Sequence, residues 1–451
     1  MRFDNLHKPV DNSALIFFRL VFGLLIFLES AGAIFTGWVK RVFIDPEFTF
    51  TFIGFEWLTP LPGYGMYLYY ALMAVFGLMV MLGLFYRFAL TSFTILWTAT
   101  YLMQKTSYNN HYYLLILLCL LMLVLPAHRY FSMDVKKHPE IKSLSCPQWC
   151  YTLIIVQLGI VYTFAAIAKM NPDWVAGLPI RLWFGAKADY PVIGSLLQED
   201  WVIMAVAFGG ILFDLLIVPV MLWKRTRLAG LYIAIFFHLF NSVVFQIGIF
   251  PYLMLAALAF FFEPEKVRRL FFKKKPTLEV NLAASNGWEF SALHKVPFKL
   301  ILGVYLAIQL WLPLRHLLFE GDVHWTEEGH RMAWRMMLRS KAGTLHYEVK
   351  IPEADISERI HPSAYLSQKQ AAKIAAYPDM IWQFSQHLKQ QYEAKGYRDI
   401  EIYAHSKVSL NGGDFYPLTD PTVNLAETEW ERFKHADWVT LRPNGSESTK
   451  E

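Results

Sequence analysis

The chain has 451 residues, of which 55% are hydrophobic, above the roughly 45–50% that is usual for soluble domains. The excess is concentrated in long apolar blocks, which exclude an ordinary soluble protein and predict a membrane body with a smaller polar domain. The net charge of +5 comes from basic residues clustered between these blocks. Because they form no single basic face, a nucleic-acid partner is not indicated.

Several apolar segments are long enough, or nearly long enough, to cross a bilayer as helices of about 20 residues. They are residues 14–35, 66–85, 88–103, 111–126, 150–169, 202–223, 228–247, 249–263 and 297–315. The first run is too long for a cleaved signal peptide and is interpreted as a retained helix. The sequence therefore predicts a polytopic α-helical membrane protein with about nine transmembrane helices.

Basic residues follow the fourth, sixth and eighth segments, within residues 129–142, 224–227 and 266–275. The positive-inside rule places these loops and the N-terminus in the cytoplasm, and everything after the ninth segment outside. We therefore expect a transmembrane domain over residues 1–317, including a cytoplasmic segment 264–296, and an extracytoplasmic domain over 318–451.

The exterior domain is predicted to be α+β or mainly β, and it contains no cysteine. Alternating apolar residues and helical periodicity indicate its elements. They are strands at 331–338 and 344–351 separated by a turn at Ala342-Gly343, helices at 368–376 and 380–394, and a strand at 399–410 followed by a turn.

Ionisable and polar side chains inside apolar segments are functional candidates, because a bilayer penalises them. Lys169 ends the fifth segment, where it either snorkels to the outer interface or acts as a partly desolvated, neutral base. Asn110 and His111 open the fourth segment on the same side. Asn110 is a reasonable helix cap, whereas His111 could donate a hydrogen bond to a developing anion.

His238, Asn241 and Ser242 lie on one face of the seventh segment, either as hydrogen-bonded core residues or as the wall of a polar cavity. Two other intramembrane charges, Glu29 and Asp214, are expected to pair with other helices. Arg19 is near the inner end of the first segment and is expected to snorkel.

Glu327, His330 and Arg331 resemble a metal site by residue type, but their spacing is not that of a recognised zinc motif. A capped turn leading into a strand explains these residues equally well. The nine-crossing arrangement also places His111 and Lys169 at outer helix ends, and His238 and Asn241 in the outer to middle part of their helix. These residues, which are far apart in the sequence, would thus lie at a similar depth in the membrane. A hydrophobic cofactor could reach them from the lipid, and a polar substrate could reach them from the outside.

Four stretches together give the chain a family resemblance. They are residues 105–114 (KTSYNNHYYL), 169–177 (KMNPDWVAG), 237–242 with 247–250 (FHLFNS, IGIF), and 325–331 with 334–337 (WTEEGHR, WRMM). They resemble the vitamin K-dependent gamma-glutamyl carboxylase family and occur in its order. The membrane part is similar to the wider class of horizontally transferred transmembrane (HTTM) domains.

The resemblance implies an integral membrane lyase that carboxylates protein glutamate side chains at the γ-carbon while reduced vitamin K is epoxidised. The cofactor is a hydroquinone such as menaquinol or phylloquinol, with O₂ and CO₂ as co-substrates and no metal. Lys169 matches the family's catalytic base, and His111 matches the catalytic histidine that supports carboxylation. Asn110, His238 and Asn241 match cofactor-binding residues.

The chain also differs from the family in two respects. Animal members carry a disulfide between the membrane and lumenal parts, which Cys119, Cys146 and Cys150 cannot make. The chain is also shorter, which suggests a bacterial inner-membrane protein and leaves the choice of glutamate-containing protein or peptide substrate open. The alternatives are a quinone oxygenase that never carboxylates and a non-enzymatic transporter or lipid-binding protein, although the chain lacks the internal repeat common in transporters.

Overall fold

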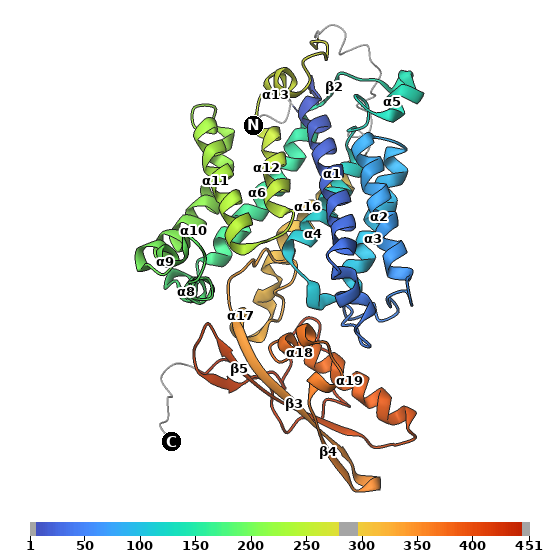
Figure 1. The fold of residues 1–451 in the computed structure, drawn as a ribbon, viewed down its shortest axis with the longest axis vertical. Helices are drawn as coiled ribbons and strands as arrows, with labels where there is room; N and C mark the ends of the chain where they lie inside the picture. Colours follow the sequence, from blue (N-terminus) through green and yellow to red (C-terminus); the bar gives the residue numbers. More distant parts are fainter. Residues whose placement is uncertain (1–5, 279–295, 444–451) are drawn as a thin grey trace.

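The computed structural model describes residues 6–278 and 296–443, except for the side chains of 296–298. A body of long helices occupies one end and a smaller sheet-containing domain the other (Figure 1). The 3₁₀ segment η6 (Leu312–Leu318) runs across the expected boundary between the two. The division at residue 317 therefore stays a prediction.

All nine predicted segments are helical in the described residues. They are α1 (Ser13–Phe35), α2 (Gly65–Leu82), α3 (Tyr86–Met103), α4 (Asn110–Val124), α6 (Gln148–Lys169), α10 (Asp200–Leu222), α11 (Arg227–Phe245), α12 (Phe250–Ala257) with η5 (Leu258–Phe261), and α16 (Val296–Trp311) with η6. Among the described residues, six helices are long and apolar enough to cross a membrane. The helix α3 is not one of them, and α4 and α12 with η5 are shorter. The helical membrane body is thus confirmed, but the count of nine crossings is not.

The first two helices approach each other closely through glycines. A Cβ atom on Gly23 of α1 would lie 2.3 Å from the backbone nitrogen of Met81, and one on Gly77 of α2 would lie 2.7 Å from that of Phe27. Such contacts are sterically impossible for any larger residue. Small residues at this crossing therefore let the two backbones meet, as is common between membrane helices.

The three predicted basic loops lie at the end of the body opposite the sheet (Figure 1). This end carries α5 (Met133–Lys137), η4 (Pro139–Ile141), α13 (Pro264–Phe271) and the short pair β1 (Pro9–Asp11) and β2 (Ser145–Pro147). The expected cytoplasmic segment 264–296 is described only in part, because residues 279–295 lie outside the described ranges.

The expectation that Arg19 snorkels is wrong. Its side chain is fully buried, and its guanidinium donates hydrogen bonds to the carbonyl oxygens of Ala127, Tyr130 and Phe131. These carbonyls follow α4, so Arg19 joins the inner end of α1 to that loop.

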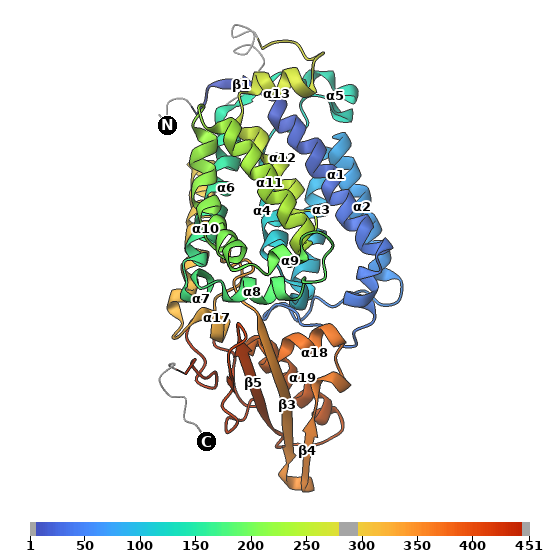
Figure 2. The same ribbon diagram turned by 60° about the vertical axis from the view of Figure 1, so that its left-hand side comes forward.

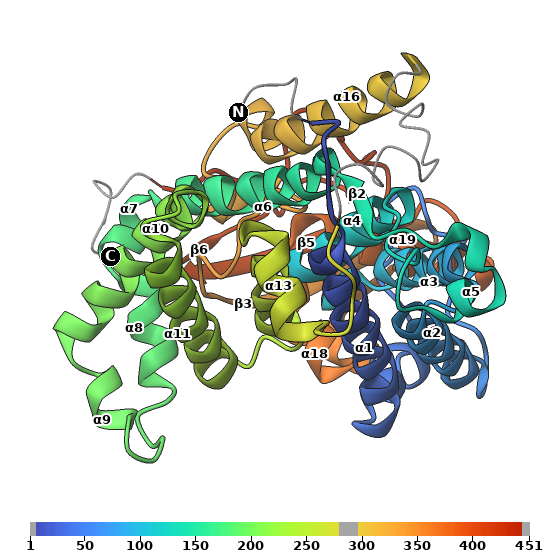
Figure 3. The same cartoon turned by 90° about the horizontal axis from the view of Figure 1, so that it is seen from above.

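Short elements fill the end of the body that faces the sheet (Figure 2). They are the π-helical turn η2 (Lys40–Ile44), the 3₁₀ turn η3 (Lys105–Ser107), α7 (Pro172–Val175), α8 (Leu178–Gly185) and α9 (Gly194–Leu197). Seen from above, α16 lies along the outside of α6 (Figure 3). Tyr305 of α16 donates a 2.6 Å hydrogen bond to Gln157 of α6, which ties the last helix to the body.

The exterior domain contains an antiparallel sheet of order β4-β3-β5-β6, against which α18 and α19 pack (Figure 2). Its strands are β3 (Lys341–Ile351), β4 (Ile356–Ile360), β5 (Glu401–Leu410) and β6 (Phe415–Pro417), and its helices are α17 (Val323–Thr326), α18 (Gln368–Ile374) and α19 (Pro378–Ala394), with 3₁₀ turns η7 (Pro352–Ala354) and η8 (Pro362–Ala364). Alternate β3 residues Tyr347, Val349 and Ile351 are buried with Phe384 and Leu388 of α19. The α+β prediction is confirmed in these residues.

The predicted strand at 331–338 and turn at Ala342-Gly343 are wrong. Residues 331–338 form no strand, and Met332, Trp334 and Met337 have φ values of +59°, +56° and +49°. An extended strand requires negative φ. The alternating apolar residues instead bury Trp334 and Leu338 in an irregular segment, and Ala342-Gly343 lies inside β3, paired with Val408 and Ser409 of β5.

Candidate active site

A cavity of about 100 Å³ lies where α6, α10 and α11 meet the start of α4 and residues 336–337. Its polar lining consists of His111, Tyr162, Lys169, Asp214, His238 and Asn241. Its apolar lining includes Trp174, Trp183, Phe237, Phe245 and Phe250. We call it the membrane cavity. The structure thus brings four of the five predicted site residues together.

The ammonium group of Lys169 lies inside the membrane body and does not snorkel. Only 8% of the residue is exposed, and its Nζ atom lies 2.5 Å from Oδ2 of Asp214 on α10. The same Nζ lies 5.6 Å from the centre of the Trp174 ring. The interfacial interpretation of Lys169 is therefore wrong, because a carboxylate on a neighbouring helix holds the amine inside the protein. The predicted pairing of Asp214 with another helix is confirmed.

The two histidines of the membrane cavity lie close together. The His111 ring stacks on the Phe250 ring with 3.9 Å between centroids. His238 is 1% exposed, and its Nε2 lies 3.0 Å from the hydroxyl of Tyr162. Its Nδ1 is buried and has no partner among the described residues. A buried, unpaired ring nitrogen is costly, so this atom is available to a ligand in the cavity.

Asn110 does not line the membrane cavity, and it is not the helix cap. The cap of α4 is Asn109, whose side chain accepts the Tyr112 backbone N–H at 2.7 Å. Asn110 accepts a hydrogen bond from Tyr108 at 2.9 Å and donates one to the Arg335 carbonyl at 3.1 Å. It therefore connects the start of α4 to the exterior domain.

Asn110 lines a second cavity of about 310 Å³, between the start of α4 and the exterior domain, which we call the cationic cavity. Its basic lining residues are Arg335, Arg339, Lys341 and Lys373. His111, Met336 and Met337 line both cavities. The two cavities are thus neighbours separated by these side chains. Ser242, in contrast, lines neither and bonds to Tyr252 at 3.0 Å.

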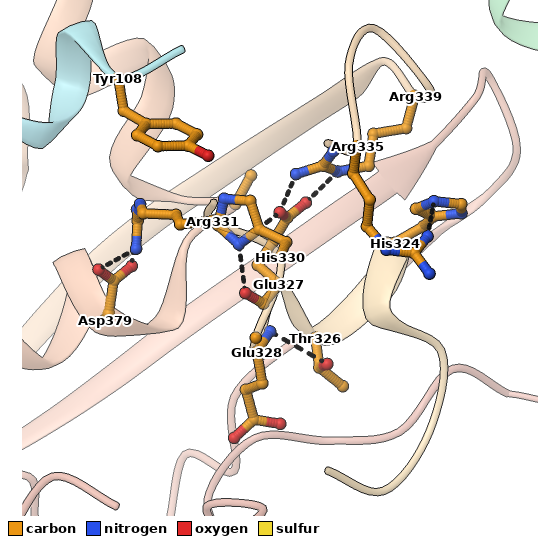
Figure 4. Close-up of polar contacts among 12 residues, drawn as sticks. Tyr108, His324, Thr326, Glu327, Glu328, His330, Arg331, Arg335, Arg339 and Asp379 are labelled. Carbon is orange, nitrogen blue, oxygen red and sulfur yellow. Dashed lines mark hydrogen bonds and ion pairs between the residues drawn. The ribbon is translucent and has the colours of Figure 1, made fainter. Parts of the chain in front are cut away.

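Glu327 contacts two residues that line the cationic cavity, Arg339 and His330 (Figure 4). It accepts two hydrogen bonds from Arg339, lies 3.3 Å from Lys341, and its backbone carbonyl contacts His330. Burial alone raises the pKa of this carboxyl group, but the charges of Arg339 and Lys341 outweigh it and hold the pKa at about 2. The Glu327 carboxylate is therefore paired with basic side chains. In the described residues, no group of three or more side chains is placed to hold a metal ion.

We expect a specific response of the exterior domain to acid. Glu327 has an ordinary pKa of 4.5 and a folded-state pKa of about 2, so its pairing stabilises the fold above pH 4.5. That contribution, on the order of 3 kcal/mol, is lost as the pH falls from 4.5 through 2. Thermal unfolding of the detergent-solubilised chain should show a falling midpoint over this range. The unfolding midpoint of Glu327→Gln should depend less steeply on pH over this range. A pH dependence equal to that of the wild type would show that Glu327 does not cause the loss of stability.

A second ion-pair network joins the exterior domain to the membrane body. Asp379, at the start of α19, lies 2.7 Å from Nζ of Lys105 in η3 and 2.6 Å from Nη1 of Arg331. Burial raises the pKa of the Asp379 carboxyl group, but these two cations outweigh it and hold the pKa below its usual value. The network fixes the exterior domain over the outer ends of the helices.

Asp379→Asn should destabilise this junction by about 3–5 kcal/mol, because it leaves two buried cations without their carboxylate. Asp399→Asn is the matched control, since Asp399 is exposed and asparagine tolerates its φ of +49°. Limited proteolysis between η6 and β3 should accelerate in the first variant only. Equal proteolysis rates in both would show that the junction does not depend on this pair.

Four non-glycine residues with positive φ lie within residues 327–337, the segment that also supplies Met336 and Met337 to the two cavities. Glu327, Met332, Trp334 and Met337 all have φ between +49° and +62°. Such backbone conformations cost of order 1–3 kcal/mol each and tend to occur at functional sites. The sequence offers no signal for them, which is why a strand was predicted here.

The sequence also missed other residues of the two cavities. Tyr162 is one of many aromatic residues in α6, and only the structure joins it to His238. Arg335 and Lys373 lie in the polar domain, where basic residues are ordinary. Asp214 was visible as an intramembrane charge, but only the fold shows that its partner is Lys169.

Comparisons with known proteins agree with this architecture. Residues 7–265 match the family model of the HTTM domain. Residues 294–444 match the model of the vitamin K-dependent gamma-carboxylase, lumenal domain. No solved structure matches the chain. Because the two models lie in order and together cover the membrane body and the exterior domain, the chain belongs to the vitamin K-dependent gamma-carboxylase family.

Proposed function

We propose that this protein is a membrane carboxylase that adds CO₂ to the γ-carbon of protein glutamate residues while reduced vitamin K is epoxidised with O₂. The observation that carries this proposal is the convergence of Lys169, His111, His238 and Asn241 on one membrane cavity. That cavity adjoins the cationic cavity beneath the exterior domain. A lipid-soluble reductant and a glutamate side chain could therefore approach the same place from opposite sides.

The side chains that line the membrane cavity offer the kinds of contact that the head group of a reduced quinone needs. Aromatic side chains such as Phe237 and Phe250 offer flat apolar contacts, and the unpaired Nδ1 of His238 offers a hydrogen bond. Asn241 adds an amide on the same face of α11. When bound, the hydroquinone supplies the reducing equivalents and, with O₂, the strong base that the glutamate carbon requires.

Lys169 is proposed to take the proton of the hydroquinone hydroxyl group. An ammonium group cannot accept a proton, so Lys169 must first be uncharged. Asp214, 2.5 Å from Nζ, is placed to take that proton and return it. The apolar walls exclude water, which would otherwise protonate the strong base before it reached the glutamate.

His111 is proposed to assist carboxylation because it borders both cavities. A hydrogen bond from its ring would stabilise negative charge developing on the substrate. Asn110 is proposed to act indirectly, by holding the Arg335 backbone beside the start of α4. The glutamate-containing peptide would bind at the exterior domain, on the extracytoplasmic side of an integral membrane protein.

The main alternative is a quinone oxygenase that forms epoxide without carboxylating anything. It would use the same membrane cavity but would have no need of the neighbouring cationic cavity. A transporter or lipid-binding protein would need neither Lys169 nor O₂.

The test uses the full chain in lipid nanodiscs with reduced vitamin K, O₂, ¹⁴C-labelled bicarbonate and a glutamate-rich peptide. We expect quinone epoxide together with acid-stable label in the peptide, and neither product when the quinone is oxidised. Epoxide without label would favour the oxygenase, and the absence of both would contradict the proposal.

A further inference from the structure

The cationic cavity has a charge imbalance. Its lining includes Arg335, Arg339, Lys341 and Lys373, and contains no aspartate or glutamate among the described residues. Glu327 lies beside the cavity, already accepts hydrogen bonds from Arg339 and lies 3.3 Å from Lys341. One carboxylate, that of Glu327, therefore pairs with two cations, Arg339 and Lys341. The charge of Asp322 also favours the charged form of Arg335.

The other two cations have only neutral partners. Arg335 donates to Nε2 of His324 at 2.9 Å and to Nε2 of His316 at 2.8 Å, and Figure 4 shows it beside His324 rather than beside Glu327. Lys373 donates to the backbone carbonyl of Thr106 at 2.7 Å. Neither forms an ion pair with an acidic side chain in the part of the chain that the structure describes.

Both cations are also partly buried. Burial lowers the pKa of Arg335 to about 10, and burial together with the nearby charge of Lys369 lowers that of Lys373 to about 8. Unneutralised charges in such surroundings are unfavourable, and a bound anion would relieve the cost. The cavity can therefore take a ligand carrying two negative charges.

The position of the cavity suggests where those charges arise. His111, Met336 and Met337 lie between it and the membrane cavity, so a side chain held there would lie beside His111, on the side that faces the membrane cavity. In the proposed reaction the γ-carbon loses a proton to the base, and the electron pair left behind forms a bond to the carbon of CO₂. A side chain with one carboxylate thereby becomes a malonate-like side chain with two.

We propose that the cationic cavity is a binding site for a 1,3-dicarboxylate, with Arg335 and Lys373 each supplying the counter-charge for one carboxylate. This inference rests on the proposed function for the identity of its natural ligand. The glutamate substrate neutralises one of the two cations and the carboxylated product neutralises both. The second cation thus stabilises the carboxylate that CO₂ addition creates. For this reason the carboxylated product binds more tightly than the glutamate substrate.

The experiment measures binding of malonate and of propionate to the full chain in detergent without quinone, by calorimetry at fixed ionic strength. Charge-assisted hydrogen bonds to a second carboxylate should make malonate bind about 10-fold more tightly than propionate. Lys373→Met should remove most of that preference. Lys369→Met is the control for loss of a nearby positive charge, because Lys369 lies one turn away on α18, bonds to Ser107 and does not line the cavity. Since the charge of Lys369 disfavours the charged form of Lys373, its removal should not weaken malonate binding.

Arg335→Gln is a second variant, with thermal unfolding measured beside it because Arg335 also holds His316 and His324. Equal affinities for malonate and propionate in the wild type would overturn the inference, as would equal losses in Lys373→Met and Lys369→Met. A carboxylating enzyme without malonate preference would refute this site and leave the proposed function standing. Malonate preference without epoxidation or carboxylation would support the site and refute the function.

Discussion

Lys169→Ala is expected to lower quinone epoxidation and glutamate carboxylation together, by about 10²–10⁴-fold, the usual contribution of a general base. The lysine is the only amine lining the membrane cavity among the described residues, so no second amine is available there to replace it. The measurement is the initial rate of epoxide formation by chromatography and of label incorporation, on the same sample.

This substitution also leaves Asp214 as a buried carboxylate without its partner, which could destabilise the body by about 3–5 kcal/mol. The double variant Lys169→Ala/Asp214→Asn removes that unpaired charge and separates loss of the base from loss of folding. Lys187→Ala is the matched control, because Lys187 contacts Tyr190 and does not line the cavity. Near-normal epoxide formation by a folded Lys169→Ala protein would refute its role as base.

His111→Ala is expected to reduce carboxylation by about 10²–10³-fold, the typical effect of removing one donor to a developing anion, with a much smaller loss of epoxidation. The reason is its position, since His111 faces the membrane cavity and also borders the cationic cavity where the substrate side chain would lie. The measurement is the ratio of carboxylated peptide to epoxide, which is independent of the amount of active protein.

The control for this prediction must account for packing, because the His111 ring stacks on Phe250. His111→Phe keeps an aromatic ring and lacks the nitrogen atoms, so it should uncouple the two products as His111→Ala does. His138→Ala, at an exposed histidine near η4, should change neither rate. A proportional loss of both products in the His111 variants would instead assign the residue to quinone binding or folding.

Much of the architecture follows from local sequence. The apolar segments become helices because a bilayer leaves backbone groups no other partner, and nine of them lie where hydropathy places them. Periodicity locates α18, α19 and β5 within a few residues. The segment at 331–338 is the exception, because its alternation arises from an irregular chain with left-handed residues, which periodicity cannot distinguish from a strand.

By itself, the sequence determined the membrane body, the placement of basic loops at one end and the residue types that carry the family motifs. These features depend on composition and spacing along the chain. Only the tertiary structure decided that Lys169 meets Asp214 and that His111 borders two cavities. It alone also showed that Arg335 and Lys373 form no ion pair with a carboxylate among the described residues. The contacts of Lys169 and Lys373 join residues 45 and 267 positions apart, which no local pattern encodes.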